Sequence, residues 1–421
     1  MTAATAASSS EREDWKNTIL AGLANYIDAG SIVAGAAALA LWVKAYGLST
    51  DFVGMIGAFG PNAIAAGVGA LIGGRLCDLF GRKKIYQYDM LFYAFGMFWL
   101  VFAVNAWMIV IGFFLVGLAV GADIPASWSL IAEMAPDDKR GKHSGVAQVL
   151  WYLGPVVVLV LFLILEPLGL LGARIVFAHL AVLAIALTFL RSKMSESKRW
   201  EEAQANAEIA QRWRWQDLFT RQHIGSMAFL AGMYLFWNLW AGTNGFFFPY
   251  ILSTVGNQSH AMSVAIQAFS FLLGMGSIFF IFMKLSDKVN QRLLFGLSAI
   301  TQIVGMALLA IFPLTLPVAI IHVVLMAIGQ GFGAQCFFQL WSSEMFPTAL
   351  RATAQGVMFA VVRIALGVFS FFVPWLTATS FTTLAWILVG FLTISGIIGF
   401  VWAPRNEGKS LEQLDAERAA A

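Results

Sequence analysis

Apolar stretches of about twenty residues, each long enough to cross a bilayer as an α-helix, recur along the whole chain between short polar breaks. Hydrophobic residues make up 59% of the 421 residues and charged residues only 12%, roughly half the share of a soluble domain. A soluble core cannot bury so much apolar surface, so lipid must solvate most of it. The sequence therefore predicts an all-α membrane protein.

Twelve of these stretches are predicted to span the membrane, six on either side of a polar, charged central segment. They lie near residues 17–43, 53–75, 86–105, 107–132, 145–165, 173–191, 225–253, 262–284, 293–312, 316–342, 353–377 and 383–403. The predicted organisation is an N-terminal tail, a six-helix half, a central loop, a second six-helix half and a C-terminal tail, at residues 1–16, 17–191, 192–223, 224–403 and 404–421.

Positive charge lies almost entirely on one side of this predicted arrangement. Of the 26 Lys and Arg residues, all but Lys44, Arg174 and Arg363 fall in the tails or in the loops that face that side. The positive-inside rule assigns this side to the cytoplasm, so both termini and the central loop are predicted to be cytoplasmic, in the cell (inner) membrane. The net charge of +3 reflects this asymmetry and gives no indication of a nucleic-acid partner.

The most specific local motif joins the second and third predicted helices. The run Gly74-Arg-Leu-Cys-Asp-Leu-Phe-Gly-Arg-Lys-Lys84 places Asp78 at the end of one helix and Arg82 just after a glycine turn. The two side chains can therefore form a short charge lock. Residues 286–292, at the equivalent place in the second half, are a degraded copy, as expected of parallel six-helix repeats.

A Glu-then-Arg arrangement also occurs twice. Glu133 and Arg140 bracket the end of the fourth predicted helix, and Glu344 and Arg351 bracket the end of the tenth. Two further polar motifs follow the sixth and twelfth predicted helices, Ser195-Glu-Ser-Lys-Arg-Trp200 and Glu407-Gly-Lys-Ser-Leu-Glu412.

Together these motifs resemble those of the major facilitator superfamily, in particular its sugar-porter and metabolite:H⁺ symporter branch. The resemblance spans nearly the whole chain. It implies two pseudo-symmetric halves of six helices, a secondary transporter and not an enzyme, a small-molecule substrate, a monomer, and no cofactor besides the coupling proton. In that family the charged motif residues form cytoplasmic salt bridges that gate the transporter, which implies this role for Asp78, Arg82, Glu133, Arg140, Glu344 and Arg351. The alternative for any one of them is an ordinary solvated surface charge.

Three ionisable residues, Asp28, Asp123 and Arg363, lie near the middle of predicted spans. A charged group at this depth costs several kcal/mol, so it usually faces a cavity and has a function. Counted along their helices, the three side chains reach a similar depth, where transporters of this kind bind substrate between their halves. They predict a site for a charged or proton-carrying solute.

Asp28 is predicted to carry a proton. It lies where proton-coupled sugar porters resemble one another in having a proton acceptor, but the arginine that usually pairs with it on the fourth helix is Phe113 here. Without a cation, desolvation favours the protonated acid; the alternative is structural hydrogen bonding. Asp123 is a second candidate, because the run 121–125 resembles the Gly-Asp-Tyr-Pro pattern of phosphate:H⁺ symporters, although it lacks the tyrosine.

Arg363 is predicted to bind substrate, because its guanidinium offers a planar fork for a carboxylate or phosphate. The alternative is an internal ion pair with Asp28 or Asp123. By resemblance to sugar porters, Gln148 and Asn244 match sugar-contacting positions. Further polar or aromatic residues predicted to line the site are Asn238, Gln335, Gln339, Trp151, Trp237 and Trp341, although each tryptophan is as readily explained by packing.

The predicted function is a proton-coupled symporter that imports a small polar metabolite by alternating access. The substrate is expected to be sugar- or polyol-like, with a sugar acid slightly favoured over a neutral sugar because of Arg363. Three alternatives remain open: an organic-anion or phosphate-type H⁺ symporter, an H⁺-coupled exporter of cationic compounds, and a nutrient sensor that does not transport.

Overall fold

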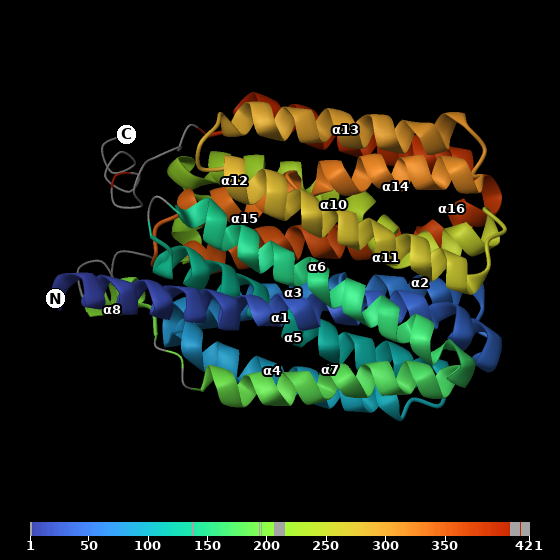
Figure 1. The fold of residues 1–421 in the computed structure, drawn as a ribbon, viewed down its shortest axis with the longest axis horizontal. Coiled ribbons are helices and arrows are strands. Elements are labelled where there is room, and N and C mark those ends of the chain that lie inside the picture. Colours follow the sequence, from blue (N-terminus) through green and yellow to red (C-terminus); the bar gives the residue numbers. More distant parts are fainter. Residues whose placement is uncertain are drawn as a thin grey trace.

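The computed structural model of the protein describes residues 2–136, 139–192, 194, 196–205, 215–404 and 413, and their regular structure is entirely helical. Figure 1 shows the long helices lying side by side along the long axis of the molecule. The helices of the first half, coloured blue to green, form the lower layer, and those of the second half, yellow to red, the upper layer. The predicted fold class, an all-α membrane protein with two six-helix halves, is confirmed.

The first half contains six long helical segments, and five of them, all but α4, are long and apolar enough to cross a membrane. Their helices are α1 (Thr2–Tyr46), α2 (Thr50–Phe59) with α3 (Ile64–Phe80), α4 (Arg82–Val101), α5 (Ala106–Met134), α6 (Arg140–Leu165) and α7 (Leu170–Arg191). A short 3₁₀ helix, Glu166–Leu168, joins α6 to α7, and α8 (Lys198–Ala205) follows α7.

The second half repeats this arrangement after a 3₁₀ turn at Trp215–Phe219. Its helices are α10 (Arg221–Thr254), α11 (His260–Ser277) with a π-helix (Ile278–Phe282) and α12 (Met283–Leu285), α13 (Gln291–Ile311), α14 (Leu316–Gln330) with α15 (Ala334–Glu344), and α16 (Arg351–Trp402). Helix α16 contains the last two segments, because Ser380 has non-helical angles (φ −160°, ψ 94°) at a kink.

Two spans that the sequence predicts as single helices are broken in the middle. The second span breaks between α2 and α3, at Gly60-Pro-Asn-Ala63, where the proline lacks the N–H that a continuous helix needs. The tenth span breaks between α14 and α15, at Gly331-Phe-Gly333. Broken helices inside a membrane protein are tolerated where the freed backbone groups line a cavity or are buried in protein.

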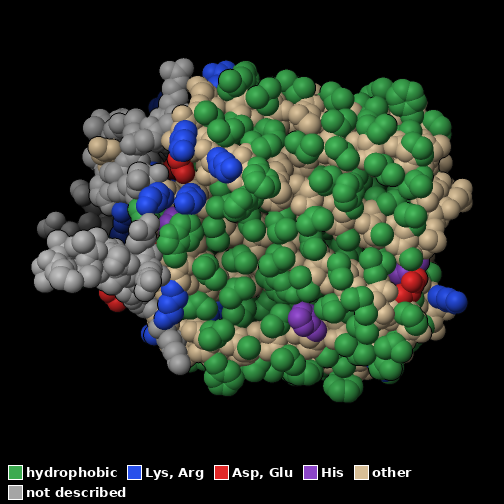
Figure 2. Space-filling model, in the orientation of Figure 1, with side chains coloured by type: hydrophobic (Ala, Val, Ile, Leu, Met, Phe, Trp, Pro, Cys, Tyr) green, Lys and Arg blue, Asp and Glu red, His purple; other side chains and the backbone are tan. Residues whose placement is uncertain are grey.

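The surface of the bundle matches a lipid environment. Figure 2 shows hydrophobic side chains covering the flank of the molecule, while Lys and Arg gather at one end. We call this the basic end; α4, α6 and α16 begin there, with Arg82, Arg140 and Arg351. The other end, where α2 and α11 begin, is called the opposite end. Many large apolar side chains on the flank are exposed, as expected where lipid and not water is the solvent.

Candidate binding site

A cavity lies between the two halves, beside the break that separates α2 from α3. Its empty volume, which includes space open to solvent, is about 630 Å³. It is lined by Ile32, Val33, Asn62, Trp151, Tyr152, Trp237, Asn238, Ala241, Asn244, Gly245, Gln267, Ser270, Phe271, Gln330, Gln335 and Arg363. Six of these are amides, so the lining is rich in neutral hydrogen-bonding groups with a single charge.

The amides on the second half offer acceptors that the protein itself does not satisfy. Asn238 and Gln267 are both 1% exposed, and their side-chain carbonyl oxygens have no hydrogen-bond partner. The Gln267 amide donates to the carbonyl of Gly245 at 2.9 Å, and Tyr234 donates its hydroxyl to Gln335 at 2.6 Å. Because buried acceptors without donors are costly, these oxygens suit a ligand that brings hydroxyl groups.

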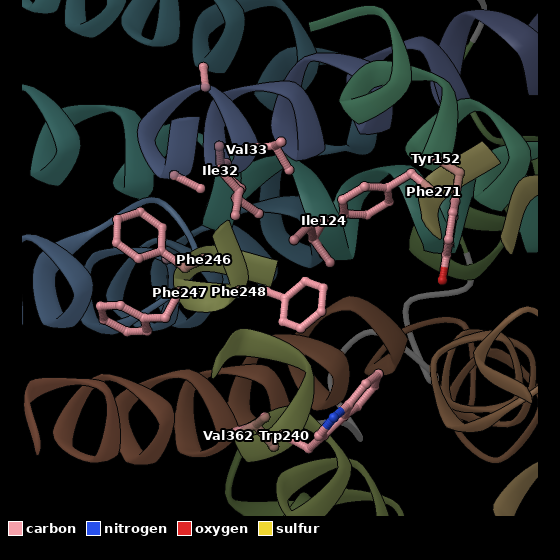
Figure 3. Packing of buried hydrophobic residues seen from close by; sticks show 14 of the residues in the cluster. Ile32, Val33, Ile124, Tyr152, Trp240, Phe246, Phe247, Phe248, Phe271 and Val362 are labelled. Carbon is pink, nitrogen blue, oxygen red and sulfur yellow. The ribbon is translucent and has the colours of Figure 1, made fainter. Parts of the chain in front are cut away.

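Aromatic rings from both halves close one side of the cavity. Tyr152 of α6 and Phe271 of α11 meet with their ring centroids 5.6 Å apart, and Trp151 lies 6.1 Å from the same phenylalanine. Figure 3 shows the Tyr152 and Phe271 rings together at one side of the buried cluster. Trp237 contributes a further ring, and its indole N–H donates to Gln302 at 2.9 Å. Rings of this kind can stack on the apolar faces of a cyclic ligand.

Arg363 contributes the only charge of the lining, at the boundary between the halves. It is 6% exposed, and its Nη1 donates to both the carbonyl and the side-chain oxygen of Asn62, from the break between α2 and α3. Its guanidinium carbon lies 4.3 Å from the centroid of the Phe359 ring. The structure shows no direct ion pair between Arg363 and Asp28 or Asp123, which the sequence left open as an alternative.

Three predicted ligands lie away from this cavity. Gln148 donates to Gln339 at 2.5 Å, across the interface between the halves. Trp341 is fully buried and donates its indole N–H to Gln291 at 2.6 Å. Their assignment as ligands stays a prediction.

Conversely, sequence reasoning missed four polar residues of the lining: Asn62, Gln267, Ser270 and Gln330. The Gly-Pro-Asn run before Ala63 was a usable signal for the first of these, because it interrupts an apolar span.

Asp28 lies one helical turn from the cavity wall, since Ile32 on the same face of α1 lines the cavity. It is 1% exposed, and neither carboxylate oxygen has a hydrogen-bond partner. The charged groups that act on it are Asp123 and Arg191 within the first half and Arg363 across the cavity. An isolated buried carboxylate is costly when ionised, so binding a proton relieves it.

Asp123 has a partner that the sequence analysis overlooked. Arg191, the last residue of α7, was counted among the cations of the basic side, but it is fully buried and pairs with Asp123 at 2.8 Å. It also donates to the carbonyls of Leu20 and Ala21 on α1, at 3.2 and 3.0 Å. A second overlooked acid is Asp89 of α4, which is 6% exposed; neither of its oxygens accepts from an N–H or O–H donor, and its carboxyl lies beside that of Asp123.

Crosswise ion pairs close the basic end of the interface. Glu133 at the end of α5 accepts from Arg351 of α16 at 3.0 Å, and Glu344 at the end of α15 pairs with Arg140 of α6 at 3.3 Å. Each pair joins one half to the other. The two pairs involve equivalent elements of the two repeats, so the closure follows the pseudo-twofold symmetry.

Arg82 joins this closure through the turn between α3 and α4. Gly81 has φ +98°, a conformation that favours glycine, and it brings Arg82 to 3.2 Å from Asp78. The Arg82 guanidinium also donates to Glu133 at 2.8 Å and to the carbonyl of Thr348 in the second half at 3.0 Å. The predicted charge lock is therefore present within a larger network.

The acid at the end of each repeat's second span also caps a helix of the other half. Asp78 accepts from the backbone N–H and the hydroxyl of Thr353, in the first turn of α16, at 2.7 and 2.6 Å. Asp287, in the degraded copy of the motif, accepts from the N–H groups of Gly141 and Lys142 of α6, at 3.0 and 3.1 Å. The copy thus keeps its acid and the contact that this acid makes.

Two polar motifs follow the sixth and twelfth predicted helices, and the structure describes only part of the first one. Glu196 accepts from the N–H groups of Arg82 and Lys83, at 3.1 and 3.0 Å, and so caps α4. Ser195 and the segment 407–412 lie outside the described residues.

The opposite end is closed by apolar packing. Phe246 and Phe247 of α10 point away from Phe248 (Figure 3) and meet glycines of the first half. A Cβ atom at Gly57 of α2 would lie 2.5 Å from the Phe247 ring, and one at Gly35 of α1 would lie 3.3 Å from the Phe246 ring. The cavity is therefore bounded by ion pairs toward the basic end and by ring-on-glycine contacts toward the opposite end.

Comparison with known proteins identifies relatives over almost the whole chain. Residues 18–370 match the Major Facilitator Superfamily. The minor myo-inositol transporter IolF of Bacillus subtilis is 46% identical over 410 residues, 96% of this chain and 93% of that protein. The cis,cis-muconate transport protein of Acinetobacter baylyi is 25% identical, over 89% of this chain and 91% of its own.

A solved structure shares the fold. The proton:xylose symporter XylE bound to 6-bromo-6-deoxy-D-glucose superposes with a TM-score of 0.82 at 17% identity, covering 97% of this chain and 99% of that one.

Proposed function

Because this chain belongs to the major facilitator superfamily, we propose that it imports a cyclic polyol or sugar together with a proton, by alternating access. The observation that carries the proposal is the cavity between the halves, which is lined by unsatisfied amide oxygens and by aromatic rings. Its relative of 46% identity, named a minor myo-inositol transporter, supports a polyol as the substrate.

The proposed substrate contacts follow from the chemistry of the lining. Ring hydroxyls would donate to Asn238 and Gln267, whose side-chain oxygens have no donor of their own, and would accept from Arg363. The rings of Trp151 and Trp237 would cover the apolar face of the substrate. Asn244 and Gln335 would complete the set on the second half.

Asp28 is the proposed proton carrier. Its carboxylate has no hydrogen-bond partner, and it lies on the α1 face that lines the cavity through Ile32. Arg363 is one of the cations that act on Asp28. A substrate bound to Arg363 would weaken this interaction, and a proton on the Asp28 carboxylate would then neutralise its charge. Asp123, which the sequence offered as a second carrier, is paired with Arg191, so we assign it the role of a fixed counter-charge.

The basic end is proposed to face the cytoplasm, as the distribution of Lys and Arg predicts. The crosswise pairs of Glu133 and Glu344 would then hold the cytoplasmic side shut. We also propose that the protein acts as a monomer in the cell (inner) membrane, with the two six-helix halves, 17–191 and 224–403, as the rocking bodies and the central loop as their tether.

The proposal is tested with purified protein in liposomes that contain a pH dye. We expect myo-inositol or a related polyol, added outside at acidic pH, to drive proton entry, and Asp28→Asn to abolish it. Asp51→Asn, at an exposed acid in the first turn of α2, is the matched control and should behave as wild type. Uptake without proton entry would indicate a facilitator, binding without uptake a sensor, and proton exit on adding a cationic compound an exporter; each would overturn the proposal.

An anionic substrate is the second candidate, and Arg363 is the observation that favours it. The guanidinium faces the cavity without a carboxylate partner, and a relative is named for the transport of muconate, a carboxylate. Proton entry driven by a sugar acid or another organic anion, but not by polyols, would select this candidate.

A further inference from the structure

We propose that Asp89 is the residue through which the proton leaves Asp28 toward the basic end, with the Asp123–Arg191 pair as a fixed charge beside the route. This inference rests on the proposed proton coupling and extends it to a residue outside the cavity. The proton would leave the Asp28 carboxyl, which becomes a carboxylate. The Asp89 carboxylate would take it up and then release it to water at the basic end.

The placement of the two acids follows from one hydrogen bond between α1 and α4. The Tyr93 hydroxyl donates to the carbonyl of Ile27 at 3.0 Å, which sets this tyrosine beside the residue that precedes Asp28. Asp89 lies four residues before Tyr93, one helical turn or about 6 Å nearer the basic end on the same face of α4. The second acid is therefore one turn below the first.

Neither acid forms an ion pair or accepts from an N–H or O–H donor. All four carboxylate oxygens of Asp28 and Asp89 are buried without such a donor, and the Asp89 carboxyl lies beside that of Asp123. A purely structural buried carboxylate normally accepts several hydrogen bonds or pairs with a cation. A carboxyl group that must give up and take a proton has to lack such fixed donors, because they would hold it ionised.

The Asp123–Arg191 pair differs from both acids. Arg191 donates to Asp123 and to two carbonyls of α1, so protonating Asp123 would leave a buried guanidinium without its carboxylate. The Asp123 carboxylate is therefore held by a fixed donor, which neither Asp28 nor Asp89 has. Other ionisable groups near this cluster are Cys77 from α3, Tyr93 from α4 and Tyr26 from α1, and Arg363 of the second half acts on Asp28.

The test separates net transport from exchange in liposomes. Net uptake of labelled myo-inositol driven by a pH gradient requires proton release, whereas exchange of labelled for unlabelled myo-inositol across the membrane does not. We expect Asp89→Asn to lower net uptake about a hundredfold and to leave exchange within about twofold of wild type. Asp89→Glu, which restores a carboxyl group, should recover most of the net uptake.

Parallel loss of both activities would show a structural role, and loss of neither would show that the proton takes another route; either result overturns the inference. If Asp89→Asn does not fold, wild-type protein in D₂O decides the question: net uptake should slow at least about twofold while exchange does not. Equal slowing of both would overturn it. Absence of any proton entry in wild-type protein would instead contradict the proposed function, so the two failures are distinguishable.

Discussion

The two halves share a fold but divide the chemistry between them. Three buried acids of the first half, Asp28, Asp89 and Asp123, gather near the buried cation Arg191. The second half lines the cavity mainly with neutral amides, and its only buried charge there is Arg363. In the proposed function, proton chemistry would belong to the first half and most substrate contacts to the second, so the coupling would cross the interface between them. The predictions below test this division.

The largest expected effect comes from removing the cation of the first half. Arg191→Gln would leave Asp123 buried without its counter-charge and remove two hydrogen bonds to α1. We expect a loss of about 3–5 kcal/mol in stability, read as a large drop in the thermal unfolding temperature in detergent. Arg174→Gln is the matched control, because that side chain is only half-buried and makes one hydrogen bond, to the carbonyl of Ala103. Equal effects of both changes would show that the buried pair has no special weight.

The next effect concerns the link between the halves at the basic end. Glu133 accepts from both Arg82 and Arg351, so Glu133→Gln removes the charge that both guanidinium groups share. We expect the basic end to open more often and Cys77, which belongs to the same buried cluster as Ala352 of α16, to react with a maleimide about tenfold faster. Glu166→Gln, at a partly exposed acid of the opposite end, should leave the labelling rate unchanged. Unchanged labelling in Glu133→Gln would mean that this carboxylate does not hold the end closed.

A smaller effect is expected from the one charge of the second half. Arg363→Lys keeps the charge but loses the planar fork. Binding of a sugar acid should weaken by about tenfold, and binding of a neutral polyol by less than about threefold, measured by isothermal titration. The informative quantity is the difference in affinity loss between the sugar acid and the neutral polyol. If both ligands lose affinity equally, Arg363 acts only on the shape of the cavity. Unchanged binding of every ligand would remove Arg363 from the site.

The smallest effect is expected at the opposite end. Gly57→Ala would place a methyl group against the Phe247 ring, which we expect to lower the transport rate a few-fold at a cost of about 1–2 kcal/mol in the closed packing. Gly225→Ala, on the same helix as that ring but outside the cavity, is the control, because a Cβ atom there meets nothing within 4 Å. Equal rates in the two variants would show that the ring-on-glycine contact is not needed for closure.

The sequence was sufficient for the fold because the bilayer imposes a simple rule on span length. It also predicted Asp78 with Arg82 and the four residues that form the crosswise pairs, since these stand in repeated motifs at helix ends.

The sequence did not predict the buried charged residues whose burial depends on which side of the helix they face and not on their position along it. Arg191 ends an apolar span and so resembles an ordinary cation at the membrane surface, yet its side chain turns inward to Asp123. Asp89 lies only a few residues past the basic run that starts α4, so its position along the helix does not mark it as buried. Gln148 and Gln339 have the expected residue type but bond to each other, a pairing that no spacing could reveal.

The reciprocal caps of Asp78 and Asp287 have a consequence for observing the working cycle. Each acid protects backbone amides of the other half, at Thr353 for the first and at Gly141 and Lys142 for the second. When the halves part at the basic end, these amides lose their acceptors and meet water instead. Their hydrogen–deuterium exchange rates therefore report, without any added label, the fraction of time that the basic end spends open.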